Sequence, residues 1–441
     1  ETSSRNFLDI MLYCGITLKS RFITATQGKS SMSNQSYSDV NSFYPPQRTL
    51  MGPGPSEIHP RVFSAMGRPT IGYLDPVFVG MMEELKELLR YAFQTKNAMT
   101  FPVSGPGSVG MEMCFVNMVS PGDKVIVCRN GVFGGRMIEN VERCGGTAVV
   151  VEDPMGKPVD PEKVREAFVN NPDTKILAFV HAETSTGVRS DAKTLAAIAR
   201  EFDALTIVDT VTSLIGIPVL VDEWGLDAVY SGSQKCLSCT PGLSPITFSD
   251  RVVELVKNRK HKVQSWFMDL NLLLGYWGES NRTYHHTAPT NSLYSLHEAL
   301  VMLRDEGLEA SWARHRRNHL ALKAGLETLG LSYLVDEEYR LPQMNAVHVM
   351  PGIDEQEVRR RLLEEMNIEI GAGLGPLAGK IWRFGIMGYS CKMENVMLCL
   401  CALESVFDNM GAKIEVGAAE AAAYHAYAAR PTNNKPLKNA A

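Results

Sequence analysis

The chain has 441 residues and a net charge of −5, with 45% hydrophobic and 21% charged residues. This ordinary globular composition gives no reason to expect nucleic acid as a partner. No apolar run approaches the roughly 20 residues that span a bilayer, so we expect no membrane partner either. The length exceeds that of one ordinary core and predicts two domains.

Residues 1–45 differ in composition from the rest of the chain. They are rich in Ser, Thr, Asn and Tyr, and no acidic residue lies between Met11 and Ser38. That composition resembles a mitochondrial presequence, although an ordinary disordered leader is the alternative. We therefore predict a disordered extension over 1–45 that could be a targeting peptide. The expected location is mitochondrial or peroxisomal in a eukaryote, with mitochondrial preferred, and cytoplasmic otherwise.

Short apolar runs alternate with amphipathic stretches between residues 46 and 305. The runs are continuous and rich in β-branched residues, which is typical of strands buried on both faces of a parallel sheet. The alternation predicts an α/β fold with a mostly parallel, doubly wound sheet in the larger domain, 46–305. The predicted strands are 124–128, 148–151, 176–180, 205–208 and 228–230, and the predicted helices include 135–143, 161–169 and 192–202.

The segment Ser104–Gly110, SGPGSVG, follows a strand-like run and precedes a helical one. Glycines and a helix start together favour an anion such as phosphate. The segment also matches GxGxxG, which would indicate a dinucleotide-binding module. That motif requires an acidic residue after the next strand, and here Arg129 and Asn130 follow it. A single phosphate therefore fits better, with a ligand-free turn as the alternative.

Asp209 and Lys235 each follow a predicted strand of the same sheet. A buried carboxylate needs a partner, and a protonated pyridine nitrogen is a chemically useful one. A buried lysine has a lowered pKa and can attack aldehydes. Taken singly, Asp209 could cap a helix and Lys235 could lie on a surface loop. The three features occur in a fixed order: the phosphate loop, Asp209 and, about 25 residues later, Lys235. This combination is a far more specific indication of a binding site than any one of its parts.

After about residue 300 the rhythm changes and predicts a smaller C-terminal α+β domain over 306–410. Arg383 lies in the apolar run KIWRFGIMG, so it needs an anionic partner. A substrate carboxylate or a structural ion pair would both serve. The Ala-rich and then Pro/Asn/Lys-rich residues 411–441 predict a disordered tail. The predicted elements of this domain are helices 311–329, 354–365 and 393–407, and strands 346–350, 368–370 and 381–384.

Cys236 and Cys239 form a CxxC pair, but neither a second CxxC nor a pair of histidines lies at zinc spacing. We therefore predict no metal site.

Taken together, the sequence resembles the alanine–glyoxylate and serine–pyruvate aminotransferases, which are class V enzymes of fold type I that use pyridoxal 5′-phosphate (PLP). The resemblance covers about residues 48–408 and runs in family order. It rests on MGPGPS at 51–56, SGPGSVGMEM at 104–113, HAETSTGV at 181–188, VDTVTSLIG at 208–216, SGSQKCL at 231–237, YHHTAP at 284–289 and GAGLGPLAGKIWRFGIMG at 371–388.

This resemblance implies a role for each matching residue. Lys235 would form the Schiff base with PLP and carry the proton between the substrate Cα and the cofactor, and Asp209 would pair with the pyridine nitrogen. Arg383 would bind the substrate carboxylate, with Thr184 near the ring hydroxyl and the substrate. The remaining cofactor residues would be Gly107, Ser108 and Gln234 at the phosphate, Val211 and Phe133 at the ring, and Tyr284 and Thr287 from the other subunit of a homodimer.

The activity implied is a ping-pong transfer of an amino group from a small amino acid, alanine or serine, to glyoxylate or pyruvate. A (S)-ureidoglycine–glyoxylate aminotransferase, or another class V PLP enzyme such as a cysteine desulfurase, is the alternative. A catalytically silent dimer would have no use for Lys235, Asp209 and Arg383 together.

Overall fold

The computed structural model describes residues 40–278 and 282–429. Nearly all of the predicted extension at 1–45 lies outside these residues, so its targeting role and the cellular location stay predictions. The chain divides into two units at Pro46, and the unit from Gln47 onwards holds every described helix and strand. No helix in the described ranges combines the length and apolarity needed to cross a membrane.

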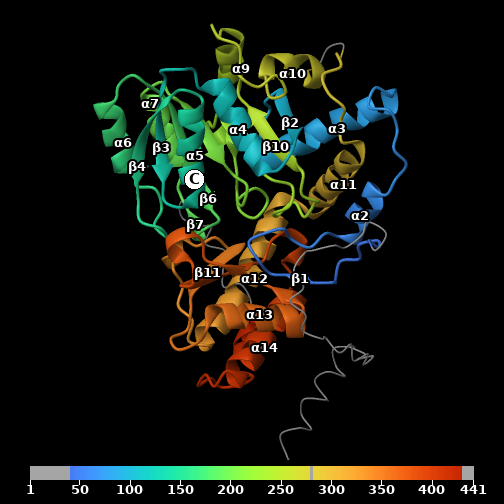
Figure 1. Cartoon of the computed structure of the whole chain (residues 1–441), viewed down its shortest axis with the longest axis vertical. Coiled ribbons are helices and arrows are strands. Elements are labelled where there is room, and N and C mark those ends of the chain that lie inside the picture. The colour runs from blue at the N-terminus through green and yellow to red at the C-terminus, as the bar shows by residue number, and fades with distance from the viewer. Residues whose placement is uncertain (1–39, 279–281, 430–441) are drawn as a thin grey trace, which may run out of the picture. The chain divides into compact units, whose positions relative to one another are not determined.

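A seven-stranded sheet organises the larger core (Figure 1). Its order is β2-β10-β9-β8-β5-β3-β4; β10 runs antiparallel to both of its neighbours, and all the other neighbouring strands pair in parallel. The predicted mostly parallel sheet is therefore confirmed. The strands are β2 (Met99–Ser104), β3 (Lys124–Arg129), β4 (Thr147–Glu152), β5 (Thr174–Val180), β8 (Leu205–Asp209), β9 (Ala228–Tyr230) and β10 (Leu243–Phe248).

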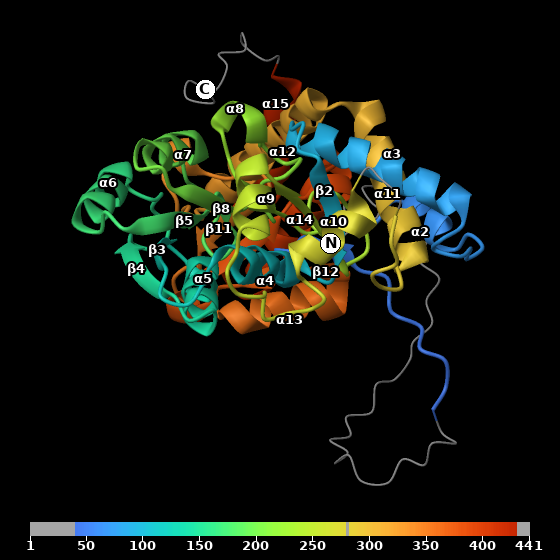
Figure 2. The ribbon, with the colours of Figure 1, turned by 90° about the horizontal axis from the view of Figure 1, so that it is seen from above.

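Helices lie on both sides of this sheet, with α4 and α5 on one side and α7 and α8 on the other (Figure 2). Proline or aspartate residues start several of them, because Asp75, Asp160 and Asp191 accept a hydrogen bond from a first-turn N–H group. The helices are α2 (Pro60–Met66), α3 (Pro76–Phe93), α4 (Gly107–Met118), α5 (Val132–Arg143), α6 (Pro161–Asn170), α7 (Ala192–Glu201), α8 (Val221–Trp224), α9 (Asp250–Lys257), α10 (Leu270–Trp277) and α11 (Thr290–Glu306).

A second hydrophobic core, centred on the buried Trp382 and Phe384, forms from residues after the start of α12 together with Met51. An antiparallel sheet of order β11-β14-β13 lies within it, and the N-terminal strand β1 (Thr49–Leu50) pairs in parallel with β12 (Ile368–Glu369). The domain boundary predicted at 305/306 stays a prediction. The other elements are β11 (Met344–His348), β13 (Gly371–Ala372), β14 (Ile381–Gly385), α12 (Leu308–Thr328), α13 (Glu355–Met366) and α14 (Met393–Asn409).

The prediction of a disordered tail from residue 411 is wrong for its first part. A helix, α15 (Ala418–Ala428), follows α14 and buries Ala419, Ala423 and Tyr427. Glu404 of α14 accepts hydrogen bonds from the first N–H groups of α15, and the Tyr427 hydroxyl donates to Asn318 of α12. Alanine has the highest helix propensity, and small side chains let the helix pack closely. Residues 430–441 lie outside the described part.

Candidate active site

Asp209 is the last residue of β8, and its side chain lies in the sheet interior with only 3% of its surface exposed. The carboxylate accepts hydrogen bonds from the Val211 N–H at 2.8 Å and the Tyr230 hydroxyl at 2.8 Å. Burial raises the pKa of Asp209 to about 7, while these two donors and the charge of Lys235 act in the opposite direction. A partner that carries a proton would therefore bind strongly here.

Lys235 lies in the loop after β9, and the chain around MGPGPS packs against it. Its Nζ donates to the carbonyl oxygen of Pro53, and its own carbonyl accepts from the Ser56 hydroxyl at 2.7 Å. Gly54 has φ +113°, and a Cβ there would lie 2.5 Å from Nζ, so glycine is required. Burial, and then the charge of Arg383, lower the pKa of Lys235 to about 8. A larger fraction of this amine is therefore neutral and nucleophilic near neutral pH.

The start of α4 provides a place for an anion. Pro106 precedes the helix without a side-chain cap, so the first N–H groups, those of Gly107 and Ser108, have no partner within the helix. A Cβ on Gly107 would lie 2.9 Å from Val211, so only glycine lets the two segments approach this closely. The buried Oε1 of Gln234 has no hydrogen-bond partner within the described structure. A buried amide oxygen without a partner indicates that the Gln234 side chain has a further hydrogen-bond partner at this point, and its NH₂ group is the end that could donate to an anion.

Phe133 lies in the first turn of α5, where its backbone N–H is bound by the Glu183 carboxylate. The Phe133 N–H donates to Glu183 Oε2 at 3.2 Å, and Ser185 donates to Oε1 from both its N–H and its hydroxyl. Glu183 is fully buried, and burial raises the pKa of its carboxyl. Arg136 covers one face of the Phe133 ring, with its guanidinium carbon 4.8 Å from the ring centroid.

Arg383 of β14 contacts Thr184, a turn residue that directly follows the strand β6 (Ala182–Glu183). Arg383 Nη1 donates to the Thr184 carbonyl oxygen at 3.0 Å, and Nε donates to the Ala372 carbonyl oxygen at 2.7 Å. The Thr184 hydroxyl bonds to the Thr212 hydroxyl. Burial lowers the pKa of Arg383 to about 10, while the charge of Glu183 opposes this. The remaining N–H groups of this guanidinium can bind one carboxylate.

Contacts and charge interactions therefore bring most of the predicted site residues into one region. Lys235 interacts electrostatically with Arg383 and Asp209, and Asp209 interacts with Glu183, which precedes Thr184. The residues brought together are Gly107, Ser108, Phe133, Thr184, Asp209, Val211, Gln234, Lys235 and Arg383. Within the described ranges, no group of three or more His, Cys, Asp or Glu side chains could hold a metal ion.

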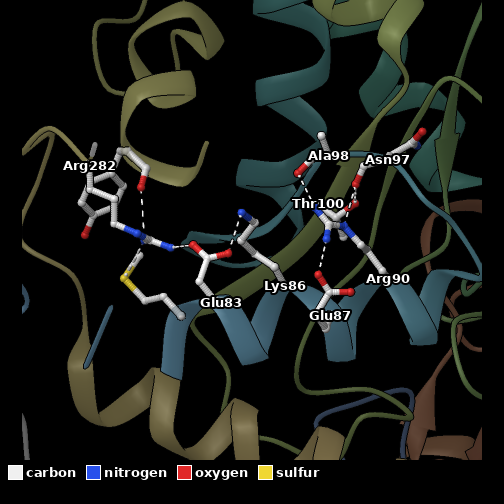
Figure 3. Close-up of polar contacts among 10 residues, drawn as sticks. Glu83, Lys86, Glu87, Arg90, Asn97, Ala98, Thr100 and Arg282 are labelled. Atoms are coloured by element: carbon white, nitrogen blue, oxygen red, sulfur yellow. Dashed lines mark hydrogen bonds and ion pairs between the residues drawn. The ribbon is translucent and has the colours of Figure 1, made fainter. Parts of the chain in front are cut away.

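Tyr284 and Thr287 are not joined to that region. Their hydroxyl groups lie 3.4 Å apart, Tyr284 packs against Tyr73, and 56% of Tyr284 is exposed. Arg282, two residues before Tyr284, fixes the start of this segment on α3. It bonds to Glu83, which also pairs at 3.0 Å with the buried Lys86 (Figure 3). Arg282 therefore connects the start of this segment to α3, while the side chain of Tyr284 is exposed.

Three sets of residues that contact the predicted site residues have no role predicted from the sequence. Pro53 and Ser56 hold Lys235, Glu183 holds Phe133, and Tyr230 holds Asp209. The first two sets lie in the MGPGPS and HAETSTGV segments, which carry the family resemblance, so the sequence contains a pattern that could have indicated them. Tyr230 looked like an ordinary strand residue in AVY, and only its pairing with Asp209 across neighbouring strands reveals its contact.

The residues present fit the cofactor that the sequence implies. PLP is an aldehyde, a pyridine and a phosphate in one molecule. A lysine of lowered pKa suits the aldehyde, a buried carboxylate suits the ring nitrogen, and the free N–H donors of an uncapped helix start suit the phosphate.

Comparison with known proteins gives a consistent result. The family model described as Aminotransferase class-V matches residues 71–393. The chain is 41% identical over 401 residues to the (S)-ureidoglycine–glyoxylate transaminase of Bacillus subtilis (strain 168), which covers 87% of this chain and 96% of that protein. It is 38% identical over 353 residues to the alanine–glyoxylate aminotransferase of Rattus norvegicus, covering 79% of this chain and 85% of the relative.

The fold is also shared with solved structures. The crystal structure of an alanine–glyoxylate aminotransferase from Nostoc sp. superposes with a TM-score of 0.82 at 45% identity, covering 85% of this chain and 100% of that one. The predicted fold type I architecture is confirmed by this similarity.

Proposed function

Because the chain belongs to the class V aminotransferase family, we propose that it transfers an amino group from a small amino acid, alanine or serine, to glyoxylate or pyruvate. The observation that carries this proposal is the meeting of Lys235, Asp209 and Arg383 in one buried region. One amine, one carboxylate and one guanidinium are the groups that a PLP aminotransferase of small monocarboxylic substrates requires.

The cofactor supplies an electron sink that stabilises negative charge at the substrate Cα when it is bound. Lys235 would hold it covalently at the aldehyde carbon. Asp209 would pair with the ring nitrogen, while Val211 and Phe133 would enclose the ring. The first N–H groups of α4, at Gly107 and Ser108, would bind the phosphate together with Gln234.

Lys235 would also move the proton once an incoming amine has released it. A neutral amine accepts the proton from Cα, and the resulting ammonium returns it to the cofactor carbon. The lowered pKa of about 8 suits this exchange, because both protonation states are then accessible near neutral pH. Pro53 accepts from Nζ and would keep the amine at the site while it is free.

Arg383 would orient the substrate through its α-carboxylate. Its Nε and one Nη group are occupied by the carbonyl oxygens of Ala372 and Thr184, which fixes the direction of the guanidinium. A single guanidinium placed for a single carboxylate favours alanine, serine, glycine and glyoxylate over dicarboxylic substrates.

A second candidate has direct support from the comparisons. The Bacillus subtilis relative named above carries the name of an (S)-ureidoglycine–glyoxylate transaminase. Both candidates use glyoxylate as the amino acceptor, so they differ in the donor. An assay of the purified enzyme with glyoxylate and alanine, serine or ureidoglycine in parallel separates them. Absence of glyoxylate-dependent turnover with all three donors would refute both.

We also propose that the active enzyme is a homodimer in which Tyr284 and Thr287 complete the cofactor site of the other subunit. Two observations support it: both side chains are exposed within the single chain, and Arg282 anchors their segment to α3. Co-expression of a Lys235→Ala chain with a Tyr284→Ala/Thr287→Ala chain should restore activity that neither variant has alone. If mixing restores nothing, these two residues act within their own subunit or not at all.

A further inference from the structure

Tyr230 and Asp209 are register partners on neighbouring parallel strands. Their Cα atoms pair between β8 and β9, and each is the last residue of its strand. The Tyr230 hydroxyl donates to Asp209 Oδ2 at 2.8 Å. Tyr230 has no exposed surface and Asp209 has 3%. Water therefore does not compete for this hydrogen bond, which strengthens it.

Tyr230 is held in place by groups on three sides. The Thr210 hydroxyl donates to its carbonyl oxygen at 2.8 Å, and β10 pairs with it through Ile246. A Cβ on Gly110 of α4 would lie 3.1 Å from the Tyr230 Cβ, so the helix packs closely on this tyrosine. These contacts fix the backbone and the Cβ of Tyr230, and its ring is fully buried beside Asp209.

The Tyr230 hydroxyl stays protonated and therefore always acts as the hydrogen-bond donor to Asp209. Burial and the negative charge of Asp209 both raise the pKa of Tyr230 well above its usual value, so the phenol keeps its proton. Asp209 Oδ1 accepts from the Val211 N–H, so each carboxylate oxygen has one fixed donor. Both donors favour the charged form of Asp209, whereas burial and the nearby charge of Glu183 favour the neutral form, and Lys235 favours the charged one.

We propose that Tyr230 is a positioning residue that keeps Asp209 anionic and directed at the cofactor ring nitrogen, so that the shared proton resides on the ring and not on the carboxylate. This inference rests on the proposed function, because it assigns Asp209 to that nitrogen. A carboxylate without the Tyr230 hydrogen bond has a higher proton affinity. It would take the proton and leave a neutral ring, which is a weaker electron sink.

The alternative is that Tyr230 only fills space in the sheet. Tyr230→Phe distinguishes the two, because phenylalanine keeps the ring and removes the hydroxyl. Tyr427→Phe is the matched control: it also removes a buried hydroxyl that donates to a side-chain oxygen, that of Asn318, between α15 and α12.

The first measurement uses the apoenzyme. The carboxyl of Asp209 is titrated by ¹³C NMR after labelling of aspartate, with Asp209→Asn providing the assignment. Loss of a charge-assisted hydrogen bond should raise its pKa by about one unit or more in Tyr230→Phe, and leave it unchanged in Tyr427→Phe. An unchanged titration in the folded Tyr230→Phe variant overturns the proposal.

The second measurement uses enzyme loaded with ¹⁵N-labelled PLP. The ring nitrogen should give the shift of a protonated pyridine in the unmodified enzyme and move towards that of a neutral pyridine in Tyr230→Phe. We expect kcat to fall about 10-fold with KM changed less than 3-fold, and no further loss when Tyr230→Phe is added to Asp209→Asn. Additive losses would contradict the proposal.

If Tyr230→Phe does not fold, 3-fluorotyrosine placed at position 230 provides the test without a change of shape. A more acidic phenol is a stronger donor, so the pKa of Asp209 should fall; an unchanged or higher pKa refutes the proposal. Failure of the proposed function would be recognised separately, because borohydride would then fix no cofactor on Lys235. The apoenzyme titration would still report on the pair of Tyr230 and Asp209.

Discussion

Arg383 donates from Nη1 to the carbonyl oxygen of Thr184 across 3.0 Å, although the two residues are 199 positions apart. Arg383 belongs to β14 in the three-stranded sheet, and Thr184 lies in the turn after β6 (Ala182–Glu183), a strand of the two-stranded sheet β6-β7. The guanidinium that would bind the substrate carboxylate is therefore fixed in part by the backbone of this turn.

Replacement of Arg383 by glutamine should lower kcat/KM for alanine and glyoxylate by about 100-fold or more, because a buried charge partner of the carboxylate is lost. Steady-state kinetics measures this. Ethylamine, which lacks the carboxylate, provides the control. It should react equally slowly with both enzymes, and an equal loss for ethylamine and alanine would show that Arg383→Gln damages the site in general.

Replacement of Lys235 by alanine should leave the fold intact and reduce transamination by at least about 10³-fold, because both covalent attachment and proton transfer are removed. Borohydride treatment followed by peptide mass analysis should then find no cofactor at position 235. The control is Lys257→Ala, which changes an exposed lysine at the end of α9. Substantial turnover by Lys235→Ala would mean that another residue moves the proton.

The capture of PLP by the apoenzyme should depend on pH with a midpoint near 8. Burial and Arg383 lower the pKa of Lys235 to about 8, so its neutral, nucleophilic form increases as pH rises through that value. A lysine amine in water has a pKa of about 10.4, so a reaction at an amine that is not desolvated would show a midpoint near that value. The rate of formation of the borohydride-stable adduct, followed from pH 6 to 10, gives the midpoint. A midpoint near 10 would show that Lys235 is not desolvated.

Asp209→Asn should change how the stability of the apoenzyme depends on pH. Burial raises the pKa of Asp209 from 3.8 to about 7, so between these values the folded chain retains a proton that the unfolded chain has released. The contribution of this group to the free energy of unfolding is therefore fully present below pH 4 and is lost as pH rises through 7.

The side chain in Asp209→Asn does not titrate, so this variant does not lose free energy of unfolding as the pH rises. Its free energy of unfolding, relative to the unmodified apoenzyme, should therefore increase by roughly 2–4 kcal/mol between pH 4 and pH 8. Urea denaturation at both pH values measures the difference. A constant difference would show that the folded and unfolded chains titrate alike at this residue.

If Phe133 packs against the cofactor ring as proposed, Phe133→Ala should weaken PLP binding by about 10-fold or more, because this aromatic contact is removed. The hydrogen bond from the backbone N–H of residue 133 to Glu183 does not depend on the side chain. The effect should therefore be confined to the ring contact. Phe133→Tyr keeps an aromatic ring and should bind PLP nearly as well as the unmodified enzyme. Fluorescence titration of the apoenzymes compares the three.

The local elements follow closely from the sequence. The predicted strand 228–230 agrees with β9 at both ends, and Asp160 and Asp354 start helices because their carboxylates accept first-turn N–H groups. The prediction of disorder from residue 411 fails at α15, because a helix this short is not stable alone and its local sequence does not predict it. Its helix forms by burying Ala419 and Ala423 and by the cap that Glu404 provides, and neither partner is visible in the local composition.

Amino-acid order alone therefore determined most of the parallel strands, the helix starts at Asp160 and Asp354, and the residue types of a site with a lysine, a carboxylate and a guanidinium, but it missed β10 and α11. Strand periodicity, helix capping and residue type are all properties of neighbouring residues in the sequence. Only the tertiary structure decided which side chains hold them: Glu183 behind Phe133, Tyr230 beside Asp209, and Thr184 against Arg383. Strand register sets the contact of Tyr230 with Asp209, and the packing of separate elements sets the other two, so all three depend on residues far apart in the chain.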